Sequence, residues 1–202
     1  MAITRDNIFN SVRRYLNRPN LADYELYDVM IATEGELNRL LRDHPRNRVM
    51  AEYLSQATGD QIQSNIPLPE DIASLVQVLS SPDEVPYKQI APDLHFSNLP
   101  YGAYYKDRGT MLQISPGLAT GEKILIDYNA LIYSLSEGTF SNWITNYFPD
   151  LYAYGMLKEM ALALKQDERF ERWSKQFDRR VDACVSQGWN QNIASAPASK
   201  VG

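Results

Sequence analysis

The sequence predicts an α+β fold: a helical bundle from the N- and C-terminal helices, a central antiparallel β-sheet insert and an extended C-terminal tail. Apolar residues recur at helical spacing in residues 1–46 and 141–187, which we assign to the bundle. Residues 47–140 contain short β-rich runs separated by Gly, Pro and Asp, so we expect them to form the insert domain. Residues 188–202 are rich in Ala, Ser, Asn and Gln, a composition typical of a flexible tail.

The N-terminal part of the bundle should contain two helices. Thr4 is a suitable N-cap for the first, since its hydroxyl can accept a hydrogen bond from the first turn. The apolar face of this helix would consist of Ile8, Val12, Tyr15 and Leu16. We expect the second helix over residues 22–42, with a stripe formed by Tyr27, Met30, Ile31, Leu37, Leu40 and Leu41. His44-Pro45 should follow its end, because the residue before a proline is disfavoured in helical conformation.

Turn residues divide the insert into strands. Gly59-Asp60 predicts a hairpin between residues 50–56 and 61–66, because glycine reaches the positive φ that two-residue turns require. Asp107-Arg108-Gly109 predicts another tight turn between two short strands.

A further strand is expected over residues 122–130. In it, alternation would place Ile124, Ile126 and Tyr128 on one face, and Leu125 and Asp127 on the other. Residues 80–101 contain four prolines and are expected to form a loop with a short helical turn.

After the insert, three helical segments are expected. Ser141-Asn142-Trp143 should begin the first, Pro149 suits the first position of the second, and Asp167 should cap the third. The buried stripe of the second would be Leu157, Met160, Ala161 and Leu164, and that of the third Phe170, Trp173, Phe177, Val181 and Cys184.

Charge is distributed unevenly along the chain. The 202 residues carry 20 Lys and Arg against 25 Asp and Glu. Residues 51–140 hold 4 basic and 11 acidic side chains, whereas the segments before and after each hold 8 basic and 7 acidic ones. A tight grip on nucleic acid requires clustered basic side chains, so we do not expect the acidic middle to hold DNA.

The sequence favours synthesis in a reducing cytoplasm. Cys184 is the single cysteine, and no Asn-x-Ser/Thr acceptor occurs. The first residues lack the apolar core of a signal peptide, and no stretch of apolar residues is long enough to span a bilayer. We therefore expect neither export nor a membrane partner.

No motif predicts a catalytic centre, a cofactor or a metal site. Neither His44 nor His95 has a second ligand at metal-binding spacing. The glycine motifs that bind phosphates or dinucleotides and the nucleophile elbow of hydrolases are missing. Cys184 lies on an apolar helix stripe, where a thiol behaves as a small hydrophobe. We expect no enzymatic activity.

Paired carboxylates leave one catalytic alternative open. Two of them about 5–9 Å apart suffice to hydrolyse a glycosidic bond. The candidate pairs are Glu70 with Asp71, Asp83 with Glu84, and Glu159 with Asp167. The first two pairs are more simply explained as turn or cap residues, and the third as a connection between helices.

Several motifs, taken in order, resemble those of the head-to-tail adaptor proteins of tailed bacteriophages, also called connector or head completion proteins. The resemblance covers roughly residues 22–180, apart from 80–101. Its motifs are Glu34-Gly35-Glu36-Leu37-Asn38-Arg39, Leu68-Pro69-Glu70-Asp71, Asp127-Tyr128-Asn129, Asn142-Trp143, and Pro149-Asp150-Leu151-Tyr152-Ala153-Tyr154-Gly155, followed by Asp167 and Trp173.

The resemblance implies a structural role in the neck of the virion. Such adaptors form a ring under the portal, typically of about twelve copies, which links the capsid vertex to the tail. The implied partners are the portal protein, a tail or nozzle protein and further copies of the chain. DNA would pass through the lumen without sequence-specific binding, and an acidic wall would not retain its phosphates.

The last helix and the tail supply the candidate interface residues. Trp189 and Ile193 are the main apolar residues of the tail, and we expect residues 187–202 to become ordered against the portal or a neighbouring subunit. Trp173 and Phe177, on the amphipathic helix before it, are further interface candidates. The alternative functions are a virion-associated glycan (peptidoglycan) hydrolase and an unrelated small soluble binding module.

Overall fold

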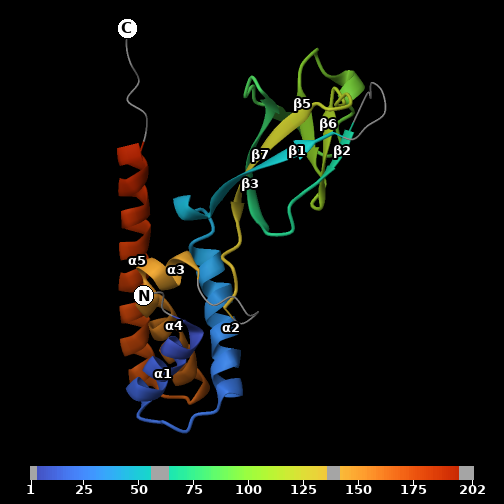
Figure 1. Ribbon diagram of the computed structural model, residues 1–202. Helices are drawn as coiled ribbons and strands as arrows, with labels where there is room; N and C mark the ends of the chain where they lie inside the picture. The colour runs from blue at the N-terminus through green and yellow to red at the C-terminus, as the bar shows by residue number, and fades with distance from the viewer. Residues whose placement is uncertain (1–3, 56–63, 136–141, 196–202) are drawn as a thin grey trace. The chain divides into compact units, whose positions relative to one another are not determined.

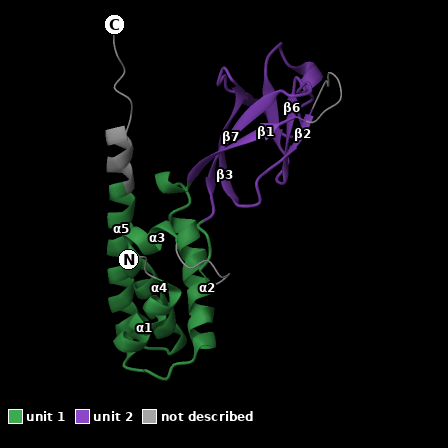
Figure 2. Ribbon diagram, in the orientation of Figure 1, with its two compact units in different colours: residues 1–47, 132–202 green, residues 48–131 purple. Residues whose placement is uncertain are grey.

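The computed structural model describes residues 4–55, 64–135 and 142–195, with side chains as far as residue 187. It confirms the α+β class, because N- and C-terminal helices flank a central region of two sheets (Figure 1). The chain divides into two compact units (Figure 2). The helical unit comprises Met1–Asn47 and Ile132–Gly202, and the β unit comprises Arg48–Leu131.

Capping residues set the starts of the helices much as the sequence predicts. The helical unit contains α1 (Arg5–Leu16), α2 (Asp23–Leu40), α3 (Trp143–Tyr147), α4 (Pro149–Ala163) and α5 (Asp167–Ser195). Thr4 is the N-cap of α1, and its backbone N–H donates to Asn7 Oδ1 at 3.2 Å. Asn142 caps α3, and Pro149 is the first residue of α4. Proline suits that position because the N–H that it lacks would have no partner within the helix.

Helix α4 lies at the centre of the helical unit, where it packs against α1, α2, α3 and α5. A helix covered on several sides is apolar around most of its circumference. Its buried residues are accordingly not confined to one stripe: Leu151, Tyr152, Ala153, Gly155, Met156, Leu157, Lys158, Met160 and Ala161.

Gly155 allows α2 to approach α4 closely. A Cβ atom at this position would overlap the methyl group of Thr33 on α2, and it would lie 3.1 Å from Cε2 of Phe177 on α5. Both neighbours are fully buried. The glycine therefore sets the spacing of three helices.

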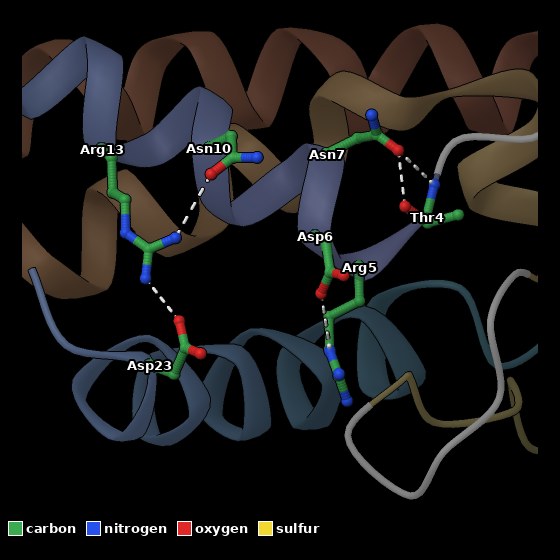
Figure 3. A network of polar contacts seen from close by, with 7 residues as sticks. All are labelled: Thr4, Arg5, Asp6, Asn7, Asn10, Arg13 and Asp23. Atoms are coloured by element: carbon green, nitrogen blue, oxygen red, sulfur yellow. Dashed lines mark hydrogen bonds and ion pairs between the residues drawn. The ribbon is translucent and has the colours of Figure 1, made fainter. Parts of the chain in front are cut away.

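A network around Arg13 fastens the end of α1 to the start of α2 (Figure 3). The Arg13 Nε donates to the Leu21 carbonyl oxygen at 3.0 Å, and Nη1 donates to Asn10 Oδ1 at 3.3 Å. The same guanidinium group forms an ion pair with Asp23 in the first turn of α2. An acidic residue there also interacts favourably with the helix dipole.

The β unit consists of two sheets with a shared apolar core. One has the strand order β1-β7-β3 and the other β2-β6-β5-β4, and of the strands that the structure describes only β4 and β5 pair in parallel. The strands are β1 (Arg48–Leu54), β2 (Ser64–Pro67), β3 (Ile72–Ser81), β4 (Lys88–Gln89), β5 (Tyr104–Asp107), β6 (Met111–Ser115) and β7 (Lys123–Ala130). The core between them includes Ile66, Val78, Tyr105, Leu112, Ile114, Ile124, Ile126 and Tyr128.

Two local predictions for the β unit are confirmed. Strand β7 occupies the range expected for it, with Ile124 and Ile126 on its buried inner face. The tight turn between β5 and β6 is present, with Gly109 at φ 85°. The Gly109 N–H donates to Asp107 Oδ1 at 2.7 Å, which closes the turn.

The predicted hairpin between residues 50–56 and 61–66 is wrong. Strand β1 pairs with β7 and β2 pairs with β6, so the two segments belong to different sheets. Gly59-Asp60 lies outside the described residues. Most of β7 is buried, and a central strand needs a partner along each edge. The long-range pairing of β1 with β7 meets this need, which a local turn signal does not reveal.

The last helix is longer than the sequence suggests. We expected it to end at Gly188, whereas α5 continues to Ser195. A glycine inside a helix costs only about 1 kcal/mol relative to alanine, which does not end a helix of 29 residues. Residues 196–202 lie outside the described part of the chain.

A pair of glycine substitutions tests the packing of α2 on α4. Gly155→Ala should lower the free energy of unfolding by about 1–3 kcal/mol, because the added methyl group overlaps Thr33. Gly35→Ala, on α2, is the matched control: nothing lies within 4 Å of the added Cβ, so stability should rise by about 0.5–1 kcal/mol. Urea unfolding followed by circular dichroism measures both changes, and equal stability of the two variants would contradict the close approach.

Candidate functional site

Helix α2 holds the chain where it returns from the β unit. The Asn38 Oδ1 accepts a hydrogen bond from the backbone N–H of Ile132 at 2.7 Å. One oxygen of the buried Glu34 accepts from the backbone N–H of Leu135, and the other accepts from the Ser134 hydroxyl, each at 2.6 Å. Glu34 and Asn38 are four residues apart and therefore share one helix face. We call these two side chains with residues 132–135 the return clasp.

A second set of contacts holds the chain where it leaves the helical unit. The buried Asn47 donates through Nδ2 to the Leu41 carbonyl oxygen at 2.7 Å and accepts from Trp143 Nε1 at 2.8 Å. The His44 ring stacks on Trp143 at a centroid distance of 4.6 Å, and its Nε2 lies 3.3 Å from the Cys184 carbonyl oxygen. Burial lowers the pKa of His44, which favours the neutral ring. We call Asn47, His44 and Trp143 the exit clasp.

Asn142 lies in the sequence between residues 132–135 of the return clasp and Trp143 of the exit clasp. Its side chain forms hydrogen bonds to the returning chain and to α3. Its Nδ2 donates to the Tyr133 carbonyl oxygen at 2.8 Å and to the Tyr152 hydroxyl at 2.7 Å. Its Oδ1 accepts from the backbone N–H of Thr145 at 3.1 Å, which caps α3. The Asn142-Trp143 motif is therefore explained by structure: one residue positions α3 and the returning chain, and the other supports the departing chain.

In the β unit, a buried carboxylate joins the three strands of the first sheet. Asp127 on β7 accepts from Arg48 Nε on β1 and from Gln77 Nε2 on β3, each at 2.9 Å. The Arg48 guanidinium group lowers the pKa of Asp127, and the hydrogen bond from Gln77 acts in the same direction. Asp127 therefore stays ionised although it is buried.

The neighbours of Asp127 are also engaged within the β unit. The Tyr128 hydroxyl donates to Asp71 Oδ1 at 3.0 Å, and Asn129 Nδ2 donates to Ser74 Oγ at 3.0 Å. The backbone N–H of Leu131 donates to the Asp71 carbonyl oxygen at 2.7 Å. Asp71 is thus a structural partner of β7, and its role in the Leu-Pro-x-Asp motif needs no ligand.

Glu159 and Cys184, two further candidate catalytic groups, have structural surroundings as well. Glu159 lies 3.5 Å from Lys158, which also forms an ion pair with Glu36. Burial raises the pKa of the Cys184 thiol to about 12, so it is not a reactive nucleophile near neutral pH. In the part of the chain that the structure describes, no three His, Cys, Asp or Glu residues form a group suited to a metal ion. Among the same residues, no helix is long and apolar enough to cross a membrane.

The predicted interface residues divide into two pairs. Trp173 is 8% exposed and stacks on Tyr154, and Phe177 is fully buried beneath Lys158. Both side chains stabilise the core of the helical unit and leave little surface for a partner. Trp189 and Ile193 lie one turn apart on α5, beyond the last residue whose side chain is described.

Exposed apolar residues on α2 form a surface that sequence periodicity missed. Tyr24 is 71% exposed, and Ile31, seven residues later, is also exposed on the same helix face. The Cβ position of Gly35, one turn further, faces open space. Ile31 was expected in the buried stripe of this helix, but Leu26, Met30, Thr33 and Leu37 form the buried side instead. We call Tyr24, Ile31 and Gly35 the α2 outer face.

The two units differ in charge. The helical unit contains 15 basic and 15 acidic residues, whereas the β unit contains 5 basic and 10 acidic ones. The whole net charge of -5 therefore lies on the β unit. The excess of acidic residues is smaller in the β unit than in residues 51–140, because the limits of the units follow the fold.

The motif residues of the two units stabilise the fold through internal contacts. Exposed surfaces, such as the α2 outer face, are left for contacts with partners. The model of the SU10 adaptor protein family matches residues 3–199. The chain therefore belongs to the SU10 adaptor protein family and is a phage adaptor protein, which confirms the resemblance to head-to-tail adaptors. A search of curated proteins finds no match.

The Asp127 cluster predicts a pH-dependent contribution to stability. Because the pKa of Asp127 is lowered in the folded protein, its contribution should be complete above the pKa of an unfolded aspartate, about 4, and should disappear as the pH falls below it. Asp127→Asn should lower the free energy of unfolding by about 1–3 kcal/mol at pH 7, and the difference from the parent protein should shrink toward pH 2.

Glu52→Gln is the matched control for this prediction. Glu52 forms an ion pair with Lys123, but both side chains are about half exposed, so the substitution should change stability little. Urea titrations between pH 7 and pH 2 provide the measurement. A constant difference between Asp127→Asn and the parent over this range would exclude an ionised Asp127 as the source of the effect.

Proposed function

We propose that the protein forms a ring under the portal of a tailed bacteriophage, where it links the capsid vertex to the tail and lets DNA pass. The match to an adaptor family over residues 3–199 carries this proposal. The proposed partners are the portal protein, a tail or nozzle protein and further copies of the chain, in a ring of about twelve subunits. The ring would lie at the head-to-tail interface of the virion.

Ring closure requires two different surfaces on each subunit, because every subunit must contact a neighbour on either side. The α2 outer face is one candidate, since it exposes Tyr24 and Ile31 with a glycine beside them. Tyrosine is among the residues enriched at the energetic hot spots of protein interfaces, and a glycine permits close approach of a second helix. We propose this face as a subunit contact.

The charge of the β unit suits a component beside a DNA channel. A surface with twice as many acidic as basic residues repels phosphates, so DNA would move past it without being held. Sequence-specific DNA binding would need basic or amide side chains directed at base edges, which an acidic unit does not favour.

We also propose that the C-terminal segment anchors the subunit to the portal or to a neighbouring adaptor. Trp189 and Ile193 are one helical turn apart on α5, so they can bind one groove together. Among the residues whose side chains the structure describes, the apolar core of the helical unit includes residues of α5 up to Cys184, with Val185 packed against it. We propose that the segment that follows makes its contact outside the subunit.

Electron microscopy of the purified protein mixed with purified portal rings tests the ring proposal. We expect additional density on one face of the portal, with rotational symmetry that matches it. The portal alone serves as the control for symmetry and for the occupied face. Finding only monomers and unmodified portal rings at micromolar concentrations would refute the proposal.

Removal of residues 188–202 tests the role of the C-terminal segment. The truncated chain should bind portal rings at least tenfold more weakly, while its unfolding midpoint stays within a few degrees of the parent, because the core residues that the structure describes all precede residue 188. A full-length Trp189→Ala/Ile193→Ala variant separates the two anchors from the rest of the segment. Unchanged portal affinity in both variants would show that the segment is not an anchor.

A further inference from the structure

Strand β1 forms an open edge of the first sheet. Among the described residues it pairs with β7 alone, in an unbroken register from Arg48 to Leu54. The Ser55 N–H donates to the Glu122 carbonyl oxygen at 2.8 Å, so residues of the same parity direct their backbone groups to β7. The N–H and C=O groups of Met50, Glu52 and Leu54 therefore point away from the sheet, toward its edge.

The other sheet edges of the β unit are protected, each in a different way. Strand β3 is covered by its own loop, since Tyr87 N–H donates to the Val78 carbonyl oxygen and Ser80 N–H donates to that of Val85, each at 2.9 Å. Strand β2 has four residues and ends in Pro67, and β4 has only two residues. Short strands, prolines and covering loops are common means of preventing strand addition.

Among the described residues, nothing gives strand β1 these protective features. It has seven residues, contains no proline, and its pairing with β7 has no bulge. Three of its exposed side chains are large and apolar: Val49 is 39%, Met50 53% and Leu54 49% exposed. Long, regular and apolar edge strands readily pair with another strand.

The charged side chains of β1 are also neutralised. Arg48 forms an ion pair with Asp127, and Glu52 forms one with Lys123 at 2.7 Å. Both partners belong to β7, so each charge is balanced inside the sheet. These cross-strand ion pairs thus neutralise charges that would otherwise oppose the binding of an incoming strand.

We propose that β1 accepts an additional strand from a different protein, in the form of an extended segment with net positive charge. The β unit holds 10 acidic and 5 basic residues, so a basic segment is attracted, while the β unit of a second copy is repelled. In such strand addition, backbone hydrogen bonds provide affinity and alternate side chains provide specificity. This inference rests on the proposed function, which makes the partner a component of the virion. It deepens that function by stating the chemistry of the partner segment.

The direct test uses the full chain and two synthetic peptides that are long enough to span β1. One alternates lysine with valine, and the other alternates glutamate with valine. The basic peptide should bind at least tenfold more tightly in fluorescence anisotropy, and its affinity should fall with added salt. It should also slow hydrogen exchange at the amides of Met50 and Glu52, which point to the edge.

Substitutions at Met50 separate the backbone from the side chain. Met50→Pro removes the outward N–H but leaves the hydrogen bonds to β7, so it should reduce peptide affinity at least tenfold. Met50→Ala keeps the N–H and should retain most of the affinity. The unfolding midpoint identifies a variant that fails to fold, and hydrogen exchange on the parent protein tests the proposal without any substitution.

Three results would overturn this inference: equal binding of both peptides, no slowing of exchange at Met50 and Glu52, or slow exchange at these amides before peptide is added. The last result would mean that the chain covers this edge itself or with a second copy. The portal experiment remains a separate test of the ring. Rings without peptide binding refute the strand site alone, and peptide binding without rings refutes the proposed function alone.

Discussion

The fold depends on hydrogen bonds from polar side chains of the helical unit to the two segments where the chain passes between the units. The β unit is inserted between α2 and α3, so the chain must leave the helical unit and return to it. Both crossings expose backbone groups that belong to no regular element, and buried groups of this kind need hydrogen-bond partners. Asn47 satisfies the departing chain, and Asn38 with Glu34 satisfies the returning chain. Without Asn38 and Glu34, the backbone N–H groups of Ile132 and Leu135 would lose these hydrogen bonds.

The motifs that relate this chain to its family are thereby explained as structural requirements. Glu34 and Asn38 hold the returning chain, Asn142 and Trp143 position α3 and the departing chain, and Gly155 sets helix spacing. None of these roles requires a substrate or a partner protein. We therefore propose that the functional surfaces lie elsewhere, on exposed faces such as that of α2 and on the edge of β1. A protein that acts by assembly can keep its internal contacts fixed while its exposed surfaces adapt to different partners.

Local signals in the sequence predicted local structure well and long-range pairing poorly. Thr4, Asn142 and Pro149 mark helix starts because their effects are confined to one turn. The pairing of β1 with β7 joins residues 69 to 81 positions apart, and nothing in either strand alone specifies the other. The return to the helical unit was expected near residue 141, but it occurs at Ile132, because hydrogen bonds to α2 hold residues 132–135. A polar pair four residues apart on an otherwise buried helix face was the available signal for this clasp.

The first and last strands of the β unit pair with each other, which makes the structure of this unit independent of the packing of the helices. Its first and last strands, β1 and β7, pair from Arg48 with Asn129 to Leu54 with Lys123, so the unit enters and leaves on adjacent strands. Its apolar core is built entirely from its own residues. We therefore expect a change in residues 82–103, which include β4, or in the charges of the sheet to act mainly within this unit. For this reason the acidic charge can be concentrated on one unit while the other stays neutral, and each can meet a different partner.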